Sequence, residues 1–273
     1  MLKQRILTAI ILVPLFVGLV LILPPKAFCI FTGLIVLWAA WEWSFLMGVK
    51  QFFYSLMYSL MMLAALIASM WLFIPNVIIA GAVWWLFALL LVVLYPRVSD
   101  IWGNGIIIRG LMGFLVLIPC WLAINFLRNI TGGVYILLLL FVLIWGADIG
   151  AYFAGRLWGK HQLAAAVSPG KTWQGVGGAL FVTIAITSLI VWSTQMPWPA
   201  WLWAFVIVIT TLFFSIVGDL FESMLKRKAG LKDSGRLLPG HGGILDRIDS
   251  LTAAAPIFLL GLELLRSSTT GAG

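Results

Sequence analysis

The sequence predicts an all-α protein that crosses a membrane about nine times, with its N-terminus in the cytoplasm. Of its 273 residues only 10% are charged, whereas 63% are hydrophobic, and the mean hydropathy is +1.12. A soluble domain is usually about a quarter charged, and its interior could not hide this much apolar surface. The apolar residues also form continuous stretches long enough to span a bilayer. Lipid is therefore the main solvent, and an ordinary water-soluble enzyme is excluded.

Nine spanning stretches can be drawn along the chain. A helix needs about 20 apolar residues to cross the hydrocarbon core. The first stretch is longer than a signal-peptide core, and Leu23-Pro24-Pro25-Lys26 offers no small-residue cleavage site, so we expect it to be retained. The last stretch is short, so we expect it to begin upstream or to pack inside the bundle. The nine stretches are residues 6–23, 28–48, 53–74, 77–95, 110–127, 133–154, 175–194, 200–221 and 251–265.

The positive charges predict the orientation. With a cytoplasmic N-terminus, fourteen of the seventeen Lys and Arg residues fall in inner segments, and the outer ones are Lys26, Arg128 and Arg266. Trp198 and Trp201 open the eighth stretch on the outer side, as an interfacial aromatic belt would. The net charge of +8 then reflects inward orientation and anionic lipid headgroups, and no nucleic-acid partner is expected.

The polar residues gather in the second half of the chain. Six of the nine acids and both histidines lie between residues 148 and 249, so we expect the chemistry there. The regions we expect are a transmembrane part for packing, dimerisation or lipid contact (1–130), a catalytic transmembrane part (131–266) with cytoplasmic loops 155–175 and 222–250, and a polar tail (267–273).

Three residues in apolar stretches of the first half are not expected to take part in the chemistry. Cys29 and Cys120 are far apart and show neither metal-ligand spacing nor a disulfide pattern. Glu42 lies between two tryptophans near the cytoplasmic end of the second stretch. We expect a structural role for it, because an acid near a helix end has a short route to water.

A first candidate site residue is Asp148, near the inner end of the sixth stretch. It shares a helix face with Tyr152, and an ionisable residue at that depth is a functional candidate by default. The alternative is a structural ion pair with an arginine such as Arg156. Beside it, Gly146, Gly150 and Ala154 form a ridge of small residues suited to close helix packing.

A second candidate is the loop Ser168-Pro169-Gly170-Lys171-Thr172, which precedes the seventh stretch. Its turn residues leave backbone N–H groups free, and a Lys and a Thr hydroxyl lie beside a helix start, which suits an anionic oxygen. The upstream glycine of a P-loop is missing, so a Walker-type ATPase is not expected.

The third candidate runs from the eighth stretch to residue 249. Asp219, Glu222 and Lys226 lie on one helical stripe, and Asp246 and Asp249 would project together from a helix. Hard oxygen donors without Cys or paired His favour Mg²⁺ over zinc, and the clustered bases favour phosphate. A solvated mixed-charge loop would explain the bases but not carboxylates at both membrane ends. Phosphate bound through a metal explains both.

The segment from Ser223 to Asp249, S-M-L-K-R-K-A-G-L-K-D-S-G-R-L-L-P-G-H-G-G-I-L-D-R-I-D, resembles the signature of the phosphatidate cytidylyltransferases (CDP-diacylglycerol synthases). S-P-G-K-T-W-Q-G at 168–175 and W-G-A-D-x-G-A-Y at 145–152 are similar to bacterial members. The opening M-L-K-Q-R and A-A-W-E-W at 39–43 extend the likeness over the whole chain.

This resemblance implies transfer of a cytidylyl group from CTP to phosphatidate, giving CDP-diacylglycerol and pyrophosphate. It also implies a requirement for Mg²⁺, with a second metal or a monovalent cation left open. Members of the family are multi-pass proteins of the bacterial inner membrane, and a homodimer with its active site on the cytoplasmic side is expected.

On this hypothesis the candidate residues take three roles. The metal ligands are Asp219, Asp246 and Asp249, with Glu222 as a further member. The catalytic residues are Asp219, Asp246, Lys226, Arg247 and His241. The residues that bind substrate or phosphate are Asp148, Ser168, Lys171, Thr172, Ser223, Arg227, Gly242 and Gly243.

Two other functions predict different sequence features. A transporter of an anionic or phosphorylated solute would be expected to show inverted repeats and broken helices at the bilayer midplane, and no repeat is visible. The other is a different CTP-dependent lipid-phosphate enzyme, or a CDP-alcohol phosphotransferase, which would be expected to show its own run of closely spaced aspartates.

Overall fold

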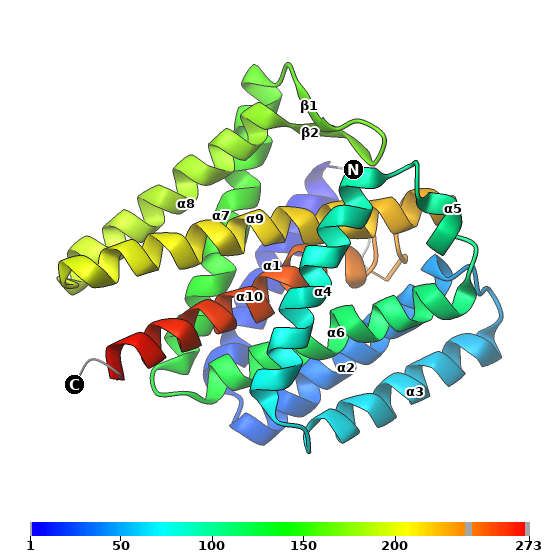
Figure 1. Cartoon of the computed structure of the whole chain (residues 1–273), viewed down its shortest axis with the longest axis horizontal. Helices are drawn as coiled ribbons and strands as arrows, with labels where there is room; N and C mark the ends of the chain where they lie inside the picture. The colour runs from blue at the N-terminus through cyan, green and yellow to red at the C-terminus, as the bar shows by residue number, and fades with distance from the viewer. Residues whose placement is uncertain (1, 238–241, 271–273) are drawn as a thin grey trace.

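Helices make up most of the computed structural model, which describes residues 2–237 and 242–270, with side chains for residues 12–237 and 242–266 (Figure 1). The predicted all-α class is confirmed. The helices are α1 (Leu2–Ile22), α2 (Pro25–Leu46), α3 (Phe52–Ser69), α4 (Ile74–Leu94), α5 (Ser99–Trp102), α6 (Ile106–Asn129), α7 (Gly133–Trp158), α8 (Trp173–Thr194), α9 (Trp198–Ala229) and α10 (Leu245–Thr270).

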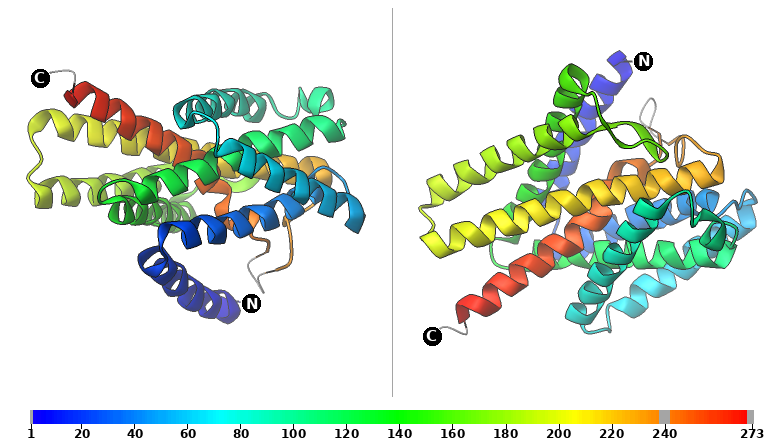
Figure 2. Two further views of the ribbon diagram at one scale, coloured as in Figure 1. Left: turned by 90° about the horizontal axis from the view of Figure 1, so that it is seen from below. Right: turned by 45° about the horizontal axis from the view of Figure 1, so that its top comes forward.

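Eight helices within the described residues are long and apolar enough to cross a membrane, from α2 to α10 without the short α5. The chain is therefore a multi-pass membrane protein. Helix α1 is also apolar in the part whose side chains are described, Leu12–Ile22, and Figure 2 shows it at the edge of the bundle. The count of nine spans and the cytoplasmic N-terminus stay predictions.

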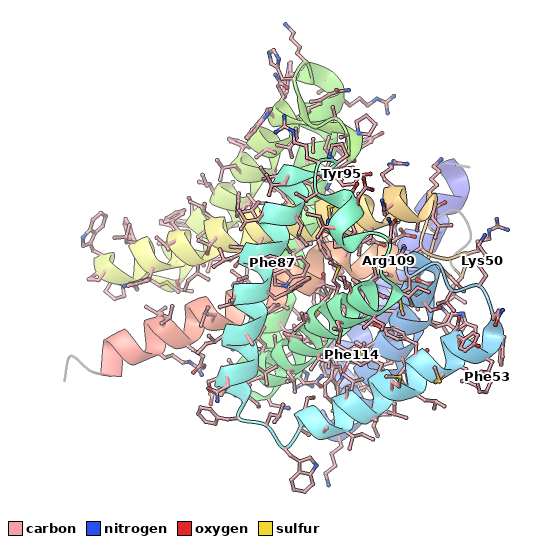
Figure 3. All side chains as sticks on the ribbon, turned by 45° about the vertical axis from the view of Figure 1, so that its right-hand side comes forward. Lys50, Phe53, Phe87, Tyr95, Arg109 and Phe114 are labelled. Atoms are coloured by element: carbon pink, nitrogen blue, oxygen red, sulfur yellow. The ribbon has the colours of Figure 1, made fainter. Side chains whose placement is uncertain are left out.

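Large apolar side chains cover much of the outer surface. Phe53 of α3 and Phe87 of α4, both labelled in Figure 3, are 68% and 50% exposed. Apolar exposure on this scale is unusual for a soluble monomer. It is the expected surface of helices whose solvent is hydrocarbon.

Helix α10 is the central element of the bundle. It packs against α4, α6, α7 and α9, and its residues 250–259 are buried throughout. It begins at Leu245, upstream of the apolar stretch that starts at residue 251. The last span was predicted either to begin upstream or to pack inside the bundle, and α10 does both. The first four residues of the predicted polar tail continue this helix to Thr270.

Helix α9 is longer than a membrane span requires. Its 32 residues extend over about 48 Å at 1.5 Å per residue, against a hydrocarbon core of about 30 Å. Asp219 lies 21 residues beyond Trp198, and so about 32 Å along the helix from it. The distance from Trp198 to Asp219 is therefore about the thickness of the hydrocarbon core, so the two ends of this segment can reach opposite membrane surfaces.

A two-stranded antiparallel hairpin joins α7 to α8 and was not predicted. It consists of β1 (Gln162–Ala164) and β2 (Ser168–Thr172), where the sequence indicated only a loop. The Gln174 side-chain oxygen accepts hydrogen bonds from the backbone N–H groups of Lys160 and His161, at 3.1 and 3.2 Å. These bonds attach the base of the hairpin to the start of α8.

Helices α7 and α8 cross closely at glycines, as the ridge of small residues predicted. A Cβ atom added to Gly150 would lie 2.8 Å from Val182 Cγ2 and against the backbone of Gly178. A Cβ atom on Gly178 would likewise overlap Ala154 and the Gly150 carbonyl, whereas one on the neighbouring Gly177 would meet nothing within 4 Å. This contact holds the walls of the site described below at a fixed separation.

We expect Gly178→Ala to destabilise the protein by about 1–3 kcal/mol, because the added methyl group overpacks the α7–α8 crossing. Unfolding of purified protein by SDS titration in detergent would measure this. Gly177→Ala is the matched control and should be neutral or slightly stabilising, because Ala favours a helix over Gly. Equal effects of the two substitutions would contradict the close crossing.

Candidate active site

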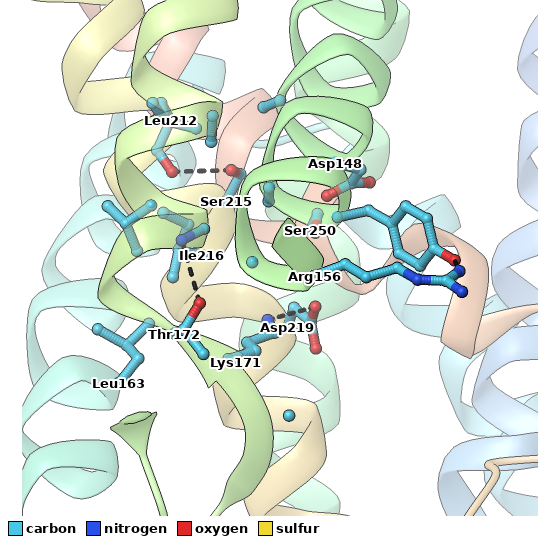
Figure 4. A pocket seen from close by; sticks show the side chains of 18 residues that line it. Asp148, Arg156, Leu163, Lys171, Thr172, Leu212, Ser215, Ile216, Asp219 and Ser250 are labelled. Carbon is cyan, nitrogen blue, oxygen red and sulfur yellow. Dashed lines mark hydrogen bonds and ion pairs between the residues drawn. The ribbon is translucent and has the colours of Figure 1, made fainter. Parts of the chain in front are cut away.

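A cavity of about 380 Å³ opens between α7, α8, α9 and strand β2 (Figure 4). Its polar lining includes Asp148 of α7, Lys171 of β2 and Asp219 of α9. Its apolar lining includes Ala179 of α8 and Leu212 of α9, which belong to helices that can span the membrane. The cavity is thus charged at one end and apolar along its wall.

The charged end of the cavity is built on an ion pair between Lys171 and Asp219. Their side chains are 27% and 28% exposed, so both can reach a ligand in the cavity. Ser223 donates a hydrogen bond from its hydroxyl to Asp219 Oδ1 at 3.3 Å. Next to Lys171, the Thr172 hydroxyl accepts from the Gly175 N–H at 3.1 Å and caps α8, which positions β2 against the helix start.

A second, more buried charge cluster lies one turn further along α9. Lys226 Nζ is 2.7 Å from Asp246 Oδ1 and 3.3 Å from Glu222 Oε2. The three side chains are only 12%, 6% and 3% exposed. Asp246 Oδ2 accepts two further bonds, from the backbone N–H groups of Ser234 at 2.9 Å and Gly243 at 2.8 Å. Both Asp246 oxygens are therefore occupied.

Asp249 lies between the two clusters. It interacts electrostatically with Asp219 and with Glu222, so it belongs to both. The close approach of α9 and α10 makes this possible, since a Cβ atom on Gly218 would lie 2.6 Å from the Asp249 carbonyl oxygen. Glu222 Oε1 is buried without a hydrogen-bond partner among the described residues. The acids thus form one continuous group along the α9–α10 contact.

The remaining predicted residues lie around these clusters. Arg247, in the first turn of α10, interacts with Asp148 across the site. Arg227 donates from Nε to the Val167 carbonyl at 3.2 Å and so contacts the hairpin, in which Ser168 opens β2. His241, predicted as catalytic, lies outside the described residues.

Gly242 and Gly243 pack against protein carboxylates. Gly242 has a positive φ of 80°, and a Cβ atom there would lie 3.3 Å from Asp246 Cγ. A Cβ atom on Gly243 would overlap the carboxyl group of Glu42. The resemblance implies that these two glycines bind substrate or phosphate, and that stays a prediction, because the contacts seen here are with side chains of the chain itself.

Sequence reasoning missed the position of Glu42 and the role of Ser250. Glu42 is only 2% exposed, so the short route to water that we expected is wrong, and its carboxylate lies beside the start of α10. Ser250 lines the cavity next to Asp249. The sequence held no signal for Ser250, whereas an acid between two tryptophans was a visible signal at position 42.

The fit of a metal ion can be judged from the donors. Within the described part of the chain, no three Asp, Glu, His or Cys side chains lie together at metal-ligating distances. Mg²⁺ commonly uses one or two carboxylates and completes its shell with water and substrate phosphates. The hard oxygen donors of Asp219 and Asp249, with the unpartnered Glu222 Oε1, suit such a cation.

Fold and site together define a membrane protein whose site combines an apolar wall with charged groups suited to phosphate. Residues 3–265 match the model of the cytidylyltransferase family. The chain is 44% identical over 260 residues to the phosphatidate cytidylyltransferase of Pseudomonas aeruginosa, covering 94% of this chain and 96% of the relative. It is 36% identical over 282 residues to that of Haemophilus influenzae, covering 94% and 97%.

A third relative, the phosphatidate cytidylyltransferase of Staphylococcus aureus, is 42% identical over 135 residues, about half of each chain. The chain belongs to the cytidylyltransferase family. It is thus an enzyme of the nucleotidyltransferase class, and the alternative of a transporter is not supported.

We expect Lys226→Met to destabilise the protein by about 3–5 kcal/mol, because it leaves the buried Glu222 and Asp246 carboxylates without their cation. Lys228→Met is the matched control two residues away. Its partner Asp100 is 86% exposed, so that substitution should cost no more than about 1 kcal/mol. Unfolding by SDS titration would measure both, and a Lys226→Met variant as stable as Lys228→Met would contradict the buried pairing.

Proposed function

We propose that this enzyme transfers a cytidylyl group from CTP to phosphatidate, forming CDP-diacylglycerol and pyrophosphate. The observation that carries the proposal is the cavity between α7, α8 and α9, with Lys171 and Asp219 at one end and an apolar wall at the other. A lipid with a phosphate headgroup matches both ends. The relatives named phosphatidate cytidylyltransferase over nearly their whole length support the same reaction.

The substrate supplies its own nucleophile. A phosphate monoester has a second pKa of about 6, so phosphatidate is largely a dianion at neutral pH and needs no general base. One of its phosphate oxygens attacks the α-phosphorus of CTP in line. The new P–O–P bond forms as the bond from the α-phosphorus to the bridging oxygen breaks, and pyrophosphate leaves with that electron pair. The protein's contribution is positioning and charge neutralisation.

Lys171 is the residue that we propose to bind the lipid phosphate. It lines the cavity, and its present partner Asp219 is a single carboxylate at a half-exposed position. A dianionic phosphate would attract the ammonium more strongly than one carboxylate does. Arg247, exposed on the first turn of α10, is placed to contact the CTP phosphates. Arg227 contributes by attaching the hairpin that carries Lys171 to α9.

For Mg²⁺ we propose Asp219 and Asp249 as the ligands, with Glu222 beside them. Asp246 is less suited to this role, because Lys226 and two backbone amides already occupy its oxygens. We propose instead that Asp246 fixes Lys226 and the turn before α10. When bound, Mg²⁺ would neutralise charge on the CTP phosphates and the leaving pyrophosphate.

We place the site on the cytoplasmic face of the inner membrane, where CTP is available. The excess of Lys and Arg in the predicted inner segments supports this side. The homodimer that the resemblance implies stays a prediction. The proposed chemistry does not require a second copy, because one chain supplies all of the described residues discussed above.

We expect purified enzyme in detergent, supplied with phosphatidate, Mg²⁺ and CTP labelled at the α-phosphate, to move the label into the lipid extract. CTP labelled at the γ-phosphate is the matched control and should leave no label in lipid, because pyrophosphate is released. Label from the γ-phosphate in lipid would indicate a kinase instead. No lipid label from either substrate, with folded protein, would refute the proposed function.

We expect Asp219→Asn to raise the Mg²⁺ concentration needed for half-maximal activity by about 10-fold or more, the scale of losses at metal sites when one supporting group is removed. Asp100→Asn, at an exposed position that does not line the cavity, is the control and should leave the Mg²⁺ dependence unchanged. A lower kcat with an unaltered Mg²⁺ titration would mean that Asp219 serves only as the partner of Lys171.

A further inference from the structure

Glu42 is a buried acid from the first half of the chain whose carboxylate lies at the site of the second half. It belongs to α2 and is 2% exposed. Among the described side chains no Lys or Arg forms an ion pair with it. A buried carboxylate without a cation is costly unless hydrogen bonds satisfy it, so its partners explain why it is there.

Four donors surround the Glu42 carboxylate, two on each oxygen. Oε1 accepts from the Ile244 N–H at 3.0 Å and from Trp38 Nε1 at 3.1 Å. Oε2 accepts from the Leu245 N–H at 2.8 Å and from the Ser234 hydroxyl at 3.1 Å. Since α10 starts at Leu245, the carboxylate caps the N-terminus of that helix, where unpaired N–H groups and the helix dipole favour an anion.

The backbone around Glu42 leaves room for this contact. Cβ atoms added to Gly235 or Gly243 would both overlap its carboxyl group. Gly235 directly follows Ser234, and Gly243 lies two residues before the start of α10. The segment therefore closes directly around the side chain, and a larger residue at either position would displace it.

Ser234 connects Glu42 to Asp246. Its hydroxyl donates to Glu42, its backbone N–H donates to Asp246 Oδ2 at 2.9 Å, and its Oγ accepts from the Asp246 N–H at 3.3 Å. Ser234 is 1% exposed, so water does not compete for these bonds. Asp246 in turn holds Lys226 at 2.7 Å. A continuous series of contacts thus runs from α2 to the charged cluster on α9.

We propose that Glu42 is a positioning residue, which fixes the turn before α10 and thereby the side chains of the first turn of α10 at the active site. Its effect on turnover rests on the proposed function. The residue touches no reacting group in this scheme and acts through Ser234 and the two backbone amides.

A glutamine at position 42 is the sharpest test, because it keeps the size of the side chain and replaces one acceptor oxygen by an NH₂ donor. Each carboxylate oxygen accepts a backbone N–H of the turn, so either orientation of the amide would set its NH₂ group against Ile244 or Leu245. We expect Glu42→Gln to lower kcat by about 10- to 100-fold, the range seen when supporting groups of a site are removed, with a smaller change in KM for CTP. Glu263→Gln, on the exposed part of α10, is the matched control and should be unchanged.

Amide hydrogen exchange of the full-length protein in detergent supplies a readout that needs no substrate. We expect faster exchange in the peptide containing Ile244 and Leu245 of Glu42→Gln, with α7 and α8 unchanged. A wild-type protein without cytidylyl transfer would refute the proposed function but leave this measurement valid. Exchange and kcat both equal to wild type in Glu42→Gln would overturn the positioning role. A uniform rise in exchange with normal kcat would indicate a merely structural acid and would also overturn it.

Ser234→Ala provides a milder variant in case Glu42→Gln does not fold. It removes one of the four donors to Glu42 and leaves both backbone amides in place. We expect Ser234→Ala to lower kcat less than Glu42→Gln does, and an unchanged kcat and unchanged exchange at Ile244 and Leu245 in Ser234→Ala would contradict the connection. Where Glu42→Gln folds, the double variant should lose less than the product of the two single losses, because both residues act in one network. A double variant whose losses multiply would contradict the connection through Ser234.

Discussion

The ion pair between Lys226 and Asp246 joins the two helices on which the site is built. Lys226 comes from α9 and Asp246 from the first turn of α10, and both side chains are nearly buried. An unpaired charge at such a position would be costly, so the pair constrains how the two helices can meet. It also fixes the place of Asp249, one turn further along α10, between the two charge clusters.

Glycines make this charged core possible inside an apolar bundle. At Gly218 the α9 backbone comes close to the Asp249 carbonyl, and at Gly235 and Gly243 the backbone closes around Glu42. A side chain at Gly218 would push α9 and α10 apart, and one at Gly235 or Gly243 would overlap the carboxyl group of Glu42. Polar groups that are far apart in the sequence can then form hydrogen bonds and ion pairs with one another. Such internal pairing matters more in a membrane protein than in a soluble one, because the hydrocarbon core holds no water to replace it.

The sequence predicted those features that depend on local pattern. The apolar stretches became helices because about 20 apolar residues have few other stable states in lipid, and the short last stretch implied the upstream start of α10 at Leu245. The hairpin Gln162–Thr172 escaped prediction because strands of three and five residues are too short to show alternation. Glu42 and Ser234 are 192 residues apart, and no periodicity reports a contact between them.

The two lysines of the site differ in their exposure and in how firmly their partners hold them. The difference indicates a structural role for Lys226 and suits Lys171 to binding a ligand. Lys226 is 12% exposed and is held by two carboxylates, one of them anchored by two backbone amides. Lys171 is 27% exposed, lines the cavity and forms an ion pair with Asp219. It also interacts electrostatically with Asp148 and Asp249. At an effective dielectric constant of about 20, one charge pair at 4 Å is worth about 4 kcal/mol, and a dianion roughly doubles that. On the proposed function, an arriving phosphate dianion would therefore compete for Lys171 more easily than for Lys226, and Asp219 would leave its ion pair as the lipid phosphate arrives.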